Sequence, residues 1–187
     1  ATEGYRAGGG TSEGLRYGVY SYLDAGEPIL PPARRLTREE LNLYIRLPQP
    51  DPRVAGLAVR LAAGLASDEA RARAIERHLR ETYAYDAGLP DREAADPLAH
   101  FLFERRRGHC EYFASAMAVM LRYLGIPARV ATGFQSGVYN PVSGWWLIRA
   151  SDAHSWVEAY LAGRGWTTFD PTPPDDSTRT LSLFARM

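Results

Sequence analysis

One stretch of the chain, residues 107–129, constrains the fold more than any other. Apolar side chains recur in it at helical spacing, which predicts a buried helix from about Glu111 to Leu124. These side chains are Phe113, Ala114, Met117, Leu121 and Leu124. Gly125 is suited to cap the C-terminus of this helix, and Pro127 prevents it from continuing. We therefore expect the rest of the domain to be built around this helix.

The only cysteine of the chain, Cys110, lies where this helix is predicted to begin. Unpaired backbone N–H groups and the helix dipole favour a thiolate, the nucleophilic form, at such a position. A lone cysteine is more often an inert buried residue than a nucleophile. The helix start favours the reactive interpretation, but a nucleophilic cysteine also needs a base and a group that orients the base.

Composition excludes several classes of function. A length of 187 residues and 45% hydrophobic residues indicate one globular domain, and a net charge of zero argues against nucleic acid as a partner. The chain contains no apolar run long enough to span a membrane, and one cysteine cannot form an internal disulfide. Paired cysteines, an HExxH motif and an EF-hand loop are absent, so we expect no metal and no cofactor.

The N-terminal part of the chain reads as an irregular, partly β extension. Strand composition occurs at Leu15–Leu23 and again at Leu41–Leu47, although the Thr-Arg-Glu-Glu sequence from Thr37 could start a helix instead. Regular patterning begins after Pro50 and is lost after Pro173. The predicted divisions are an extension, a core and a tail at residues 1–50, 51–173 and 174–187.

The core is predicted to be α+β, with helices before an antiparallel sheet. Asp51-Pro52, Ser67 and Asp96-Pro97 are helix-start signals, and each precedes an apolar pattern of helical period. Beyond the central helix the period changes to two, which is typical of strands. The predicted strands are Arg129–Phe134, Trp145–Ala150, Ala153–Leu161 and Trp166–Asp170, with a loop over Ser136–Gly144. This order indicates a helix packed on an antiparallel meander.

His154 is the best candidate for the base among the four histidines. It lies near the start of a predicted strand, which can hold an imidazole rigidly, and Asp170 ends the next strand of the same hairpin. His78 and His100 lie on predicted helices and are expected to be surface or packing residues. His109 adjoins the cysteine, but sequential residues at a helix start point in different directions.

The hairpin register decides whether Asp170 can orient His154. Paired residues in an antiparallel hairpin have a constant index sum, and side chains alternate between faces. A two-residue turn would place Asp170 on the wrong face. A three-residue turn at Ala162–Arg164 pairs His154 with Thr172 and makes Asp170 a same-face diagonal neighbour. We therefore predict an odd-length turn with a glycine at positive φ, or else a bulge that restores the parity.

Four segments, in order and spacing, resemble the transglutaminase-like superfamily. They are Arg-Gly-His-Cys-Glu-Tyr-Phe-Ala from Arg107, Leu-Gly-Ile-Pro-Ala-Arg-Val from Leu124, Ala-His-Ser-Trp-Val-Glu from Ala153, and Gly-Trp-Thr-Thr-Phe-Asp-Pro-Thr from Gly165. The particular motif forms resemble bacterial membrane-anchored transglutaminases of the transglutaminase protein A kind. The resemblance implies a papain-like fold with Cys110 as nucleophile, His154 as base and Asp170 as orienting acid. It also implies a soluble, monomeric periplasmic domain excised from a multi-pass inner-membrane protein.

The implied reaction transfers a glutamine acyl group to a primary amine through a cysteine thioester, so the expected partners are a glutamine-bearing protein or peptide and an amine donor. We expect His109, Tyr83, Tyr85 and Trp145 to line the substrate cleft, although aromatic residues of this kind are more often core residues. All 22 basic residues are arginine, so the chain offers no lysine acceptor for its own cross-linking, although codon usage explains this more simply. Hydrolysis by a cysteine peptidase or amidase, and a non-catalytic binding module, are the alternatives.

Overall fold

The computed structural model describes residues 36–47, 51–88, 94–135 and 137–174. These all belong to the second of two units in the chain, Pro32–Met187. The strand predicted at Leu15–Leu23 and the greater part of the C-terminal tail lie outside the described residues.

Helices dominate the first half of the described chain. They are α1 (Arg38–Tyr44), α2 (Pro52–Ala62), α3 (Asp68–Thr82), α4 (Pro97–His100) and α5 (Cys110–Tyr123). A π-helical segment, η1 (Phe101–Arg105), continues α4. The caps are those expected from the sequence, because the side chains of Asp51, Ser67 and Asp96 each accept a hydrogen bond from an amide in the first turn of their helix.

The strand predicted at Leu41–Leu47 is wrong. Residues 38–44 form α1 instead, because Thr37 and Glu40 make a reciprocal capping box: the Thr37 hydroxyl accepts from the Glu40 amide, and the Glu40 carboxylate accepts from the Thr37 amide. Two amides at the helix start are satisfied in this way, which outweighs the β propensity of the residues that follow. The alternative helix start at Thr37 was therefore the correct interpretation.

α5 matches the predicted central helix. It begins at Cys110 and ends at Tyr123, with Phe113, Ala114, Met117 and Leu121 fully buried. Gly125 has a φ of 74°, and the amides of Ile126 and Gly125 donate to the carbonyls of Leu121 and Arg122, each at 3.0 Å. This is a Schellman cap, in which the left-handed residue is a glycine because a side chain would be strained there.

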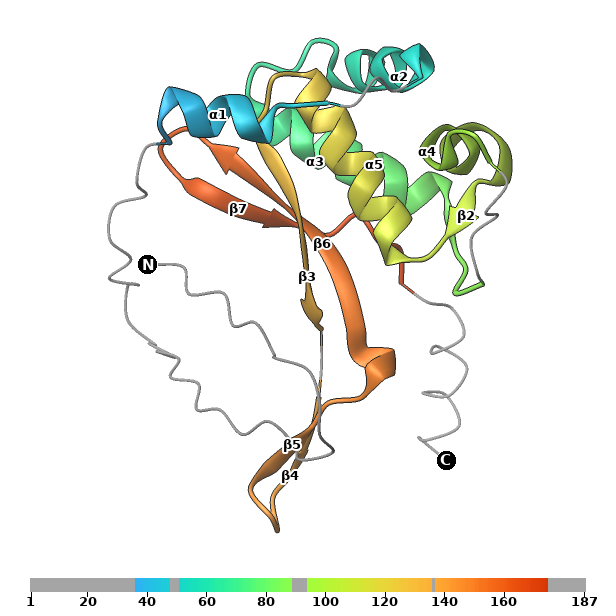
Figure 1. The fold of residues 1–187 in the computed structure, drawn as a ribbon, viewed down its shortest axis with the longest axis vertical. Coiled ribbons are helices and arrows are strands. Elements are labelled where there is room, and N and C mark those ends of the chain that lie inside the picture. The colour runs from blue at the N-terminus through green and yellow to red at the C-terminus, as the bar shows by residue number, and fades with distance from the viewer. Residues whose placement is uncertain (1–35, 48–50, 89–93, 136, 175–187) are drawn as a thin grey trace. The chain divides into compact units, whose positions relative to one another are not determined.

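The main sheet has three antiparallel strands in the order β3 (Ala128–Phe134), β6 (Ala153–Leu161) and β7 (Gly165–Phe169). α5 packs against β6 and β3, and Figure 1 shows α3 and α5 on one side of this sheet. Alternate residues of β6 from Ser155 onward are buried, whereas His154 and the residues that alternate with it are partly exposed. The α+β fold class is therefore as predicted.

The β6–β7 hairpin has the predicted register. Val157 pairs with Phe169 and Leu161 pairs with Gly165, so three residues, Ala162–Arg164, form the turn. Gly163 in this turn has a φ of 79°. The odd turn length keeps Asp170 on the same face as His154.

The segment between β3 and β6 differs from the prediction. The loop expected at Ser136–Gly144 contains β4 (Val138–Asn140), which pairs with β5 (Trp145–Leu147) in a separate two-stranded hairpin. The predicted meander was therefore wrong on this point, since β5 does not join the main sheet. Asn140 closes the hairpin, because its side-chain oxygen accepts from the amides of Val142 and Ser143.

A short pair of parallel strands joins the end of α3 to the start of α5. β1 (Ala84–Tyr85) pairs with β2 (Arg107–Gly108), and Tyr85 lies opposite Gly108. The Asp86 amide extends the pairing by donating to the Gly108 carbonyl at 2.9 Å. No helix in the described part of the chain is long and apolar enough to cross a bilayer.

Candidate active site

Cys110 is the first residue of α5. His109 precedes it in an extended conformation, with φ −88° and ψ 175°, and makes no side-chain hydrogen bond to the first helical turn. The amides of that turn are therefore not capped by the His109 side chain, and Cys110 itself is only partly buried. Among the described residues, none forms a hydrogen bond with the Cys110 thiol.

His154 and Asp170 are held together by a direct hydrogen bond. Nε2 of His154 lies 2.8 Å from Oδ2 of Asp170, and the two side chains are 11% and 28% exposed. The second carboxylate oxygen of Asp170 accepts from the Thr172 amide at 3.0 Å. Pro171 supports this turn, because it favours an extended conformation for Asp170. With Nε2 occupied by the acid, Nδ1 is the ring nitrogen of His154 that remains for another partner.

Trp156 and Gly133 define the space beside the imidazole. Gly133 lies opposite His154 in the β3–β6 ladder, and the rings of His154 and Trp156 stack with centroids 6.4 Å apart. A Cβ at Gly133 would lie 2.9 Å from Cη2 of Trp156. The indole can therefore cross the neighbouring strand only because position 133 has no side chain.

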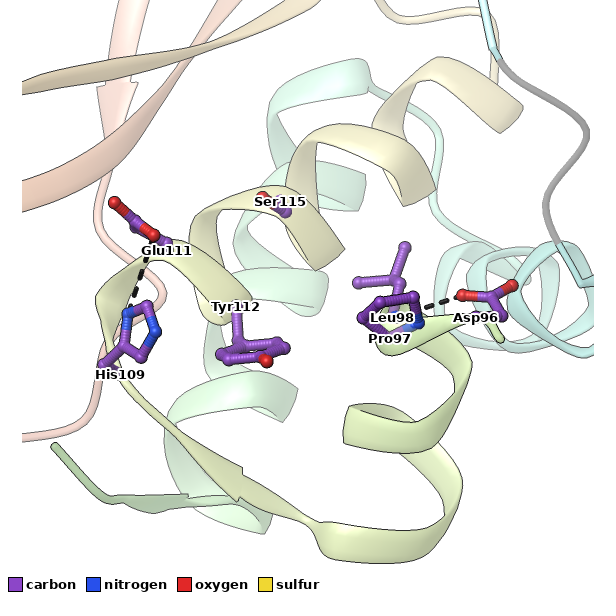
Figure 2. Close-up of a pocket in the computed structure, with 7 residues that line it drawn as sticks. All are labelled: Asp96, Pro97, Leu98, His109, Glu111, Tyr112 and Ser115. Carbon is purple, nitrogen blue, oxygen red and sulfur yellow. Dashed lines mark hydrogen bonds and ion pairs between the residues drawn. The ribbon is translucent and has the colours of Figure 1, made fainter. Parts of the chain in front are cut away.

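A cavity of about 420 Å³ opens at the His154–Asp170 pair. Its lining is mostly polar and includes Arg80, Tyr85, Gln135, Ser151, Asp152 and Thr172. Tyr85 lies both at this cavity and near Cys110, because its backbone pairs with Gly108, two residues before Cys110. Both views also show the segment that follows β7 running beside the start of α5 (Figures 1 and 2).

A second cavity, of about 320 Å³, lies on another side of the same helix start. Its lining residues are Asp96, Pro97, Leu98, His109, Glu111, Tyr112 and Ser115. Figure 2 shows the start of α5 on one side of it and the start of α4 on the other. His109 points into this region and packs edge-on against Tyr112, with ring centroids 5.0 Å apart. The residues on either side of Cys110 therefore face a different cavity from His154.

The aromatic residues predicted to line the cleft lie in three different places. Tyr85 lines the cavity beside His154, whereas Tyr83 is buried in the core, where its hydroxyl donates to the Leu102 carbonyl at 3.1 Å. Burial raises the pKa of Tyr83 above its usual value, so the hydroxyl stays a donor. Trp145 is 67% exposed on the β4–β5 hairpin and lines neither cavity.

The other histidines have structural surroundings. His78 contacts Thr82 and packs edge-on against Tyr83, and burial lowers its pKa below the usual value. His100 lies 3.6 Å from a Glu104 carboxylate oxygen on the next turn. In the described part of the chain, no three His, Cys, Asp or Glu side chains are grouped so that they could hold a metal ion.

Two residues of α3 that sequence reasoning did not single out contact Asp170. Glu76 Oε1 accepts from the Asp170 amide at 2.9 Å, and Arg80 Nη1 donates to the Asp170 carbonyl at 2.9 Å. These pairs are 94 and 90 residues apart in the chain, so no local pattern could reveal them.

Comparison with known proteins identifies the family of the chain. Residues 55–171 match the family described as the transglutaminase-like superfamily. A protein-glutamine gamma-glutamyltransferase of Pseudomonas aeruginosa is 41% identical over 123 residues, which cover 65% of this chain and 18% of that protein. The uncharacterized protein YebA of Bacillus subtilis is 37% identical over 137 residues, covering 69% of this chain and 19% of that protein.

Solved structures give the same result. The periplasmic domain of TgpA from Pseudomonas aeruginosa, in a crystal structure with bound ethylmercury, superposes with a TM-score of 0.69 at 35% identity. The match covers 77% of this chain and 52% of that one. The chain thus spans about a fifth of the curated relatives and about half of the solved domain. The family match spans well over half of the sequence, and the chain belongs to the transglutaminase-like superfamily.

Proposed function

We propose that Cys110, His154 and Asp170 form a catalytic triad that transfers the acyl group of a glutamine side chain to a primary amine. The observation that carries this proposal is the 2.8 Å hydrogen bond between His154 Nε2 and Asp170 Oδ2, at the edge of a polar cavity. The Asp170 carboxylate accepts a hydrogen bond from Nε2–H, so Nδ1 of His154 is left as the base. The pairing of Tyr85 with Gly108 supports the placement of Cys110 at this cavity.

In the first half of the reaction, the Cys110 sulfur attacks the carbonyl carbon of the glutamine carboxamide while Nδ1 of His154 takes the thiol proton. The developing oxyanion is stabilised by the Cys110 amide at the uncapped start of α5. The C–N bond then breaks, and the imidazolium gives its proton to the leaving nitrogen, which departs as ammonia. The enzyme is left as a thioester with neutral His154.

In the second half, an amine nitrogen attacks the thioester carbonyl. His154 takes a proton from the amine and returns it to the Cys110 sulfur as the C–S bond breaks, so the free thiol is regenerated. Asp170 remains ionised throughout and stabilises the imidazolium that forms twice in each cycle. The product is a secondary amide, and one ammonia is released per turnover.

Hydrolysis is the second candidate, and the polar lining of the cavity favours it. Gln135, Ser151 and Asp152 lie beside His154 there, and side chains of this kind hold water. Water in place of the amine would convert the same thioester to a carboxylate. Transfer and hydrolysis differ only in whether an amine or water attacks the thioester.

The relatives supply the substrate class and location that we propose. The Pseudomonas aeruginosa protein named a protein-glutamine gamma-glutamyltransferase supports a glutamine-bearing protein or peptide as acyl donor. The solved periplasmic domain supports a periplasmic location for this chain.

The test is an amine-incorporation assay with a glutamine-containing peptide, run beside a measurement of ammonia release without amine. Transfer predicts one amine incorporated for each ammonia released, whereas hydrolysis predicts ammonia release with glutamine converted to glutamate and no amine incorporated. Cys110→Ala should abolish both signals while the thermal unfolding midpoint stays unchanged. Equal incorporation by wild type and Cys110→Ala would refute the cysteine mechanism.

His154→Ala and His109→Ala form a matched pair for the base. Loss of a general base typically costs about 10²–10⁴-fold in rate, so His154→Ala should fall by this factor. His109 faces the other cavity, so His109→Ala should retain most of the activity. The reverse result would show that the proposed base is the wrong histidine.

A further inference from the structure

Three residues on one face of α3 contact the last residue of β7 and the residue after it. Arg73, Glu76 and Arg80 are spaced by three and four positions, which places them on one face of the helix. The Arg73 guanidinium lies 4.5 Å from the centroid of the Phe169 ring, and the other two residues contact the backbone of Asp170.

The contacts to Asp170 restrain both of its backbone polar groups. Its amide donates to Glu76 Oε1 and its carbonyl accepts from Arg80 Nη1, both at 2.9 Å. The two carboxylate oxygens are engaged as well, by His154 and by the Thr172 amide. Four independent hydrogen bonds therefore fix one residue, although it lies just beyond the last paired residue of its strand.

The charges of Arg73, Glu76 and Arg80 complement one another and the backbone groups of Asp170. Glu76 would bring a second carboxylate close to Asp170, but Arg73 Nη1 donates to Glu76 Oε2 at 2.9 Å. The Glu76 side chain is only 15% exposed, so it is held at a defined position and its bond to the Asp170 amide is charge-assisted. Arg80 adds a cation on the carbonyl side.

We infer that Glu76 and Arg80 are positioning residues, which hold Asp170 at the distance and angle required to orient His154. This inference rests on the proposed function for the role of Asp170. A carboxylate on an unpaired segment after a strand would otherwise swing with its backbone, and a displacement of about 1 Å at a catalytic group can cost up to about 10²-fold in rate.

The first test compares Glu76→Ala, Glu76→Gln and Glu81→Gln. Glu81 lies on the same helix and is exposed, so its replacement makes the same charge change as Glu76→Gln. Glu76→Ala should lower kcat by about tenfold or more with KM nearly unchanged, because Glu76 does not line the cavity beside His154. Glu76→Gln keeps an acceptor for the Asp170 amide and should recover most of the rate, and Glu81→Gln should match wild type.

An Asp170→Ala background separates positioning from general destabilisation. If Glu76 acts through the Asp170 carboxylate, adding Glu76→Ala to Asp170→Ala should cause no further loss of kcat. An equal further loss in that background would overturn the inference. If Asp170→Ala itself matches wild type, the triad fails instead, so the two failures are distinguishable.

Amide hydrogen exchange at Asp170 provides a measurement that needs no turnover and tolerates modest destabilisation. Glu76→Ala should speed exchange of this amide, compared with wild type and Glu81→Gln, while amides within β6 stay protected. Unchanged protection of the Asp170 amide in Glu76→Ala would also overturn the inference.

Discussion

Replacing Gly133 by alanine should destabilise the protein and disturb His154 through Trp156, whose indole lies against Gly133 and stacks on the imidazole. The added Cβ would lie 2.9 Å from Cη2 and 3.3 Å from Cζ3 of Trp156, closer than carbon atoms pack in proteins. The indole must move by several tenths of an ångström to relieve this clash. Since the indole stacks on the imidazole, the movement reaches His154.

The expected change in the free energy of unfolding is the difference between two opposed effects. A Gly→Ala change at a compatible position usually stabilises by about 0.4–1 kcal/mol through the unfolded chain. Forcing extra volume into a packed site costs about 1–3 kcal/mol, which should dominate at Gly133. The net destabilisation is therefore up to about 2.6 kcal/mol, and since a domain of this length shifts its Tm by roughly 2–4 °C per kcal/mol, Tm should fall by up to about 10 °C.

Thermal unfolding followed by circular dichroism measures this shift, and Gly56→Ala is the matched control. The added Cβ there would meet Arg60 Nη1 at 3.5 Å, an ordinary contact within α2, so Tm should rise. Trp156→Phe removes the outer edge of the indole and should reverse part of the loss in the Gly133→Ala background. If Gly133→Ala raised Tm as Gly56→Ala does, the steric argument would be refuted.

Two further predictions concern stability. The Thr172 hydroxyl is buried without a hydrogen-bond partner among the described residues, so Thr172→Val should raise the free energy of unfolding by about 1 kcal/mol in a denaturant titration, whereas an unchanged or lower value would contradict the argument. Burial depresses the pKa of His78 below the usual 6.5, so the unfolded chain binds its proton more readily and stability is lost as pH falls below about 6.5. His78→Asn should therefore flatten the dependence of stability on pH between 7 and about 5.5, and an unchanged slope would mean that other groups cause it.

The parts of the fold that sequence could predict are those set by neighbours along the chain. The helix starts at Asp51, Ser67 and Asp96 depend on side-chain oxygens two or three residues from the amides they cap. The β6–β7 register depends on whether the turn has an odd or an even number of residues, and the odd number places Asp170 on the same face as His154. Local rules are sufficient in these cases because the interacting groups are close in sequence.

The parts that sequence could not predict depend on distant contacts or on competing local preferences. Glu76 and Arg80 reach Asp170 across about half of the chain, and their spacing on α3 resembles any solvated helix face. Tyr83 and Tyr85 have similar local sequences, but Tyr83 is the C-cap of α3 and points into the core, whereas Tyr85 lies in β1 and reaches the cavity. The β4–β5 hairpin was missed because the glycines and proline of the expected loop masked β4, so the strand expected from Trp145 was assigned to the main sheet.

The β4–β5 hairpin is a place where residues can be inserted or deleted at little cost in stability. Phe134 and Ala153 pair directly, and the Gln135 amide donates to the Asp152 carbonyl at 3.0 Å, so the two ends of the connection are tied together at its base. The entropy of closing a loop grows only with the logarithm of its length, so shortening or extending the hairpin beyond this tie changes the closure cost by about 0.6 kcal/mol per doubling. The register of β3 on β6 is set by their own side chains. The segment can therefore be exchanged for another of different length while the strand that carries His154 keeps its place.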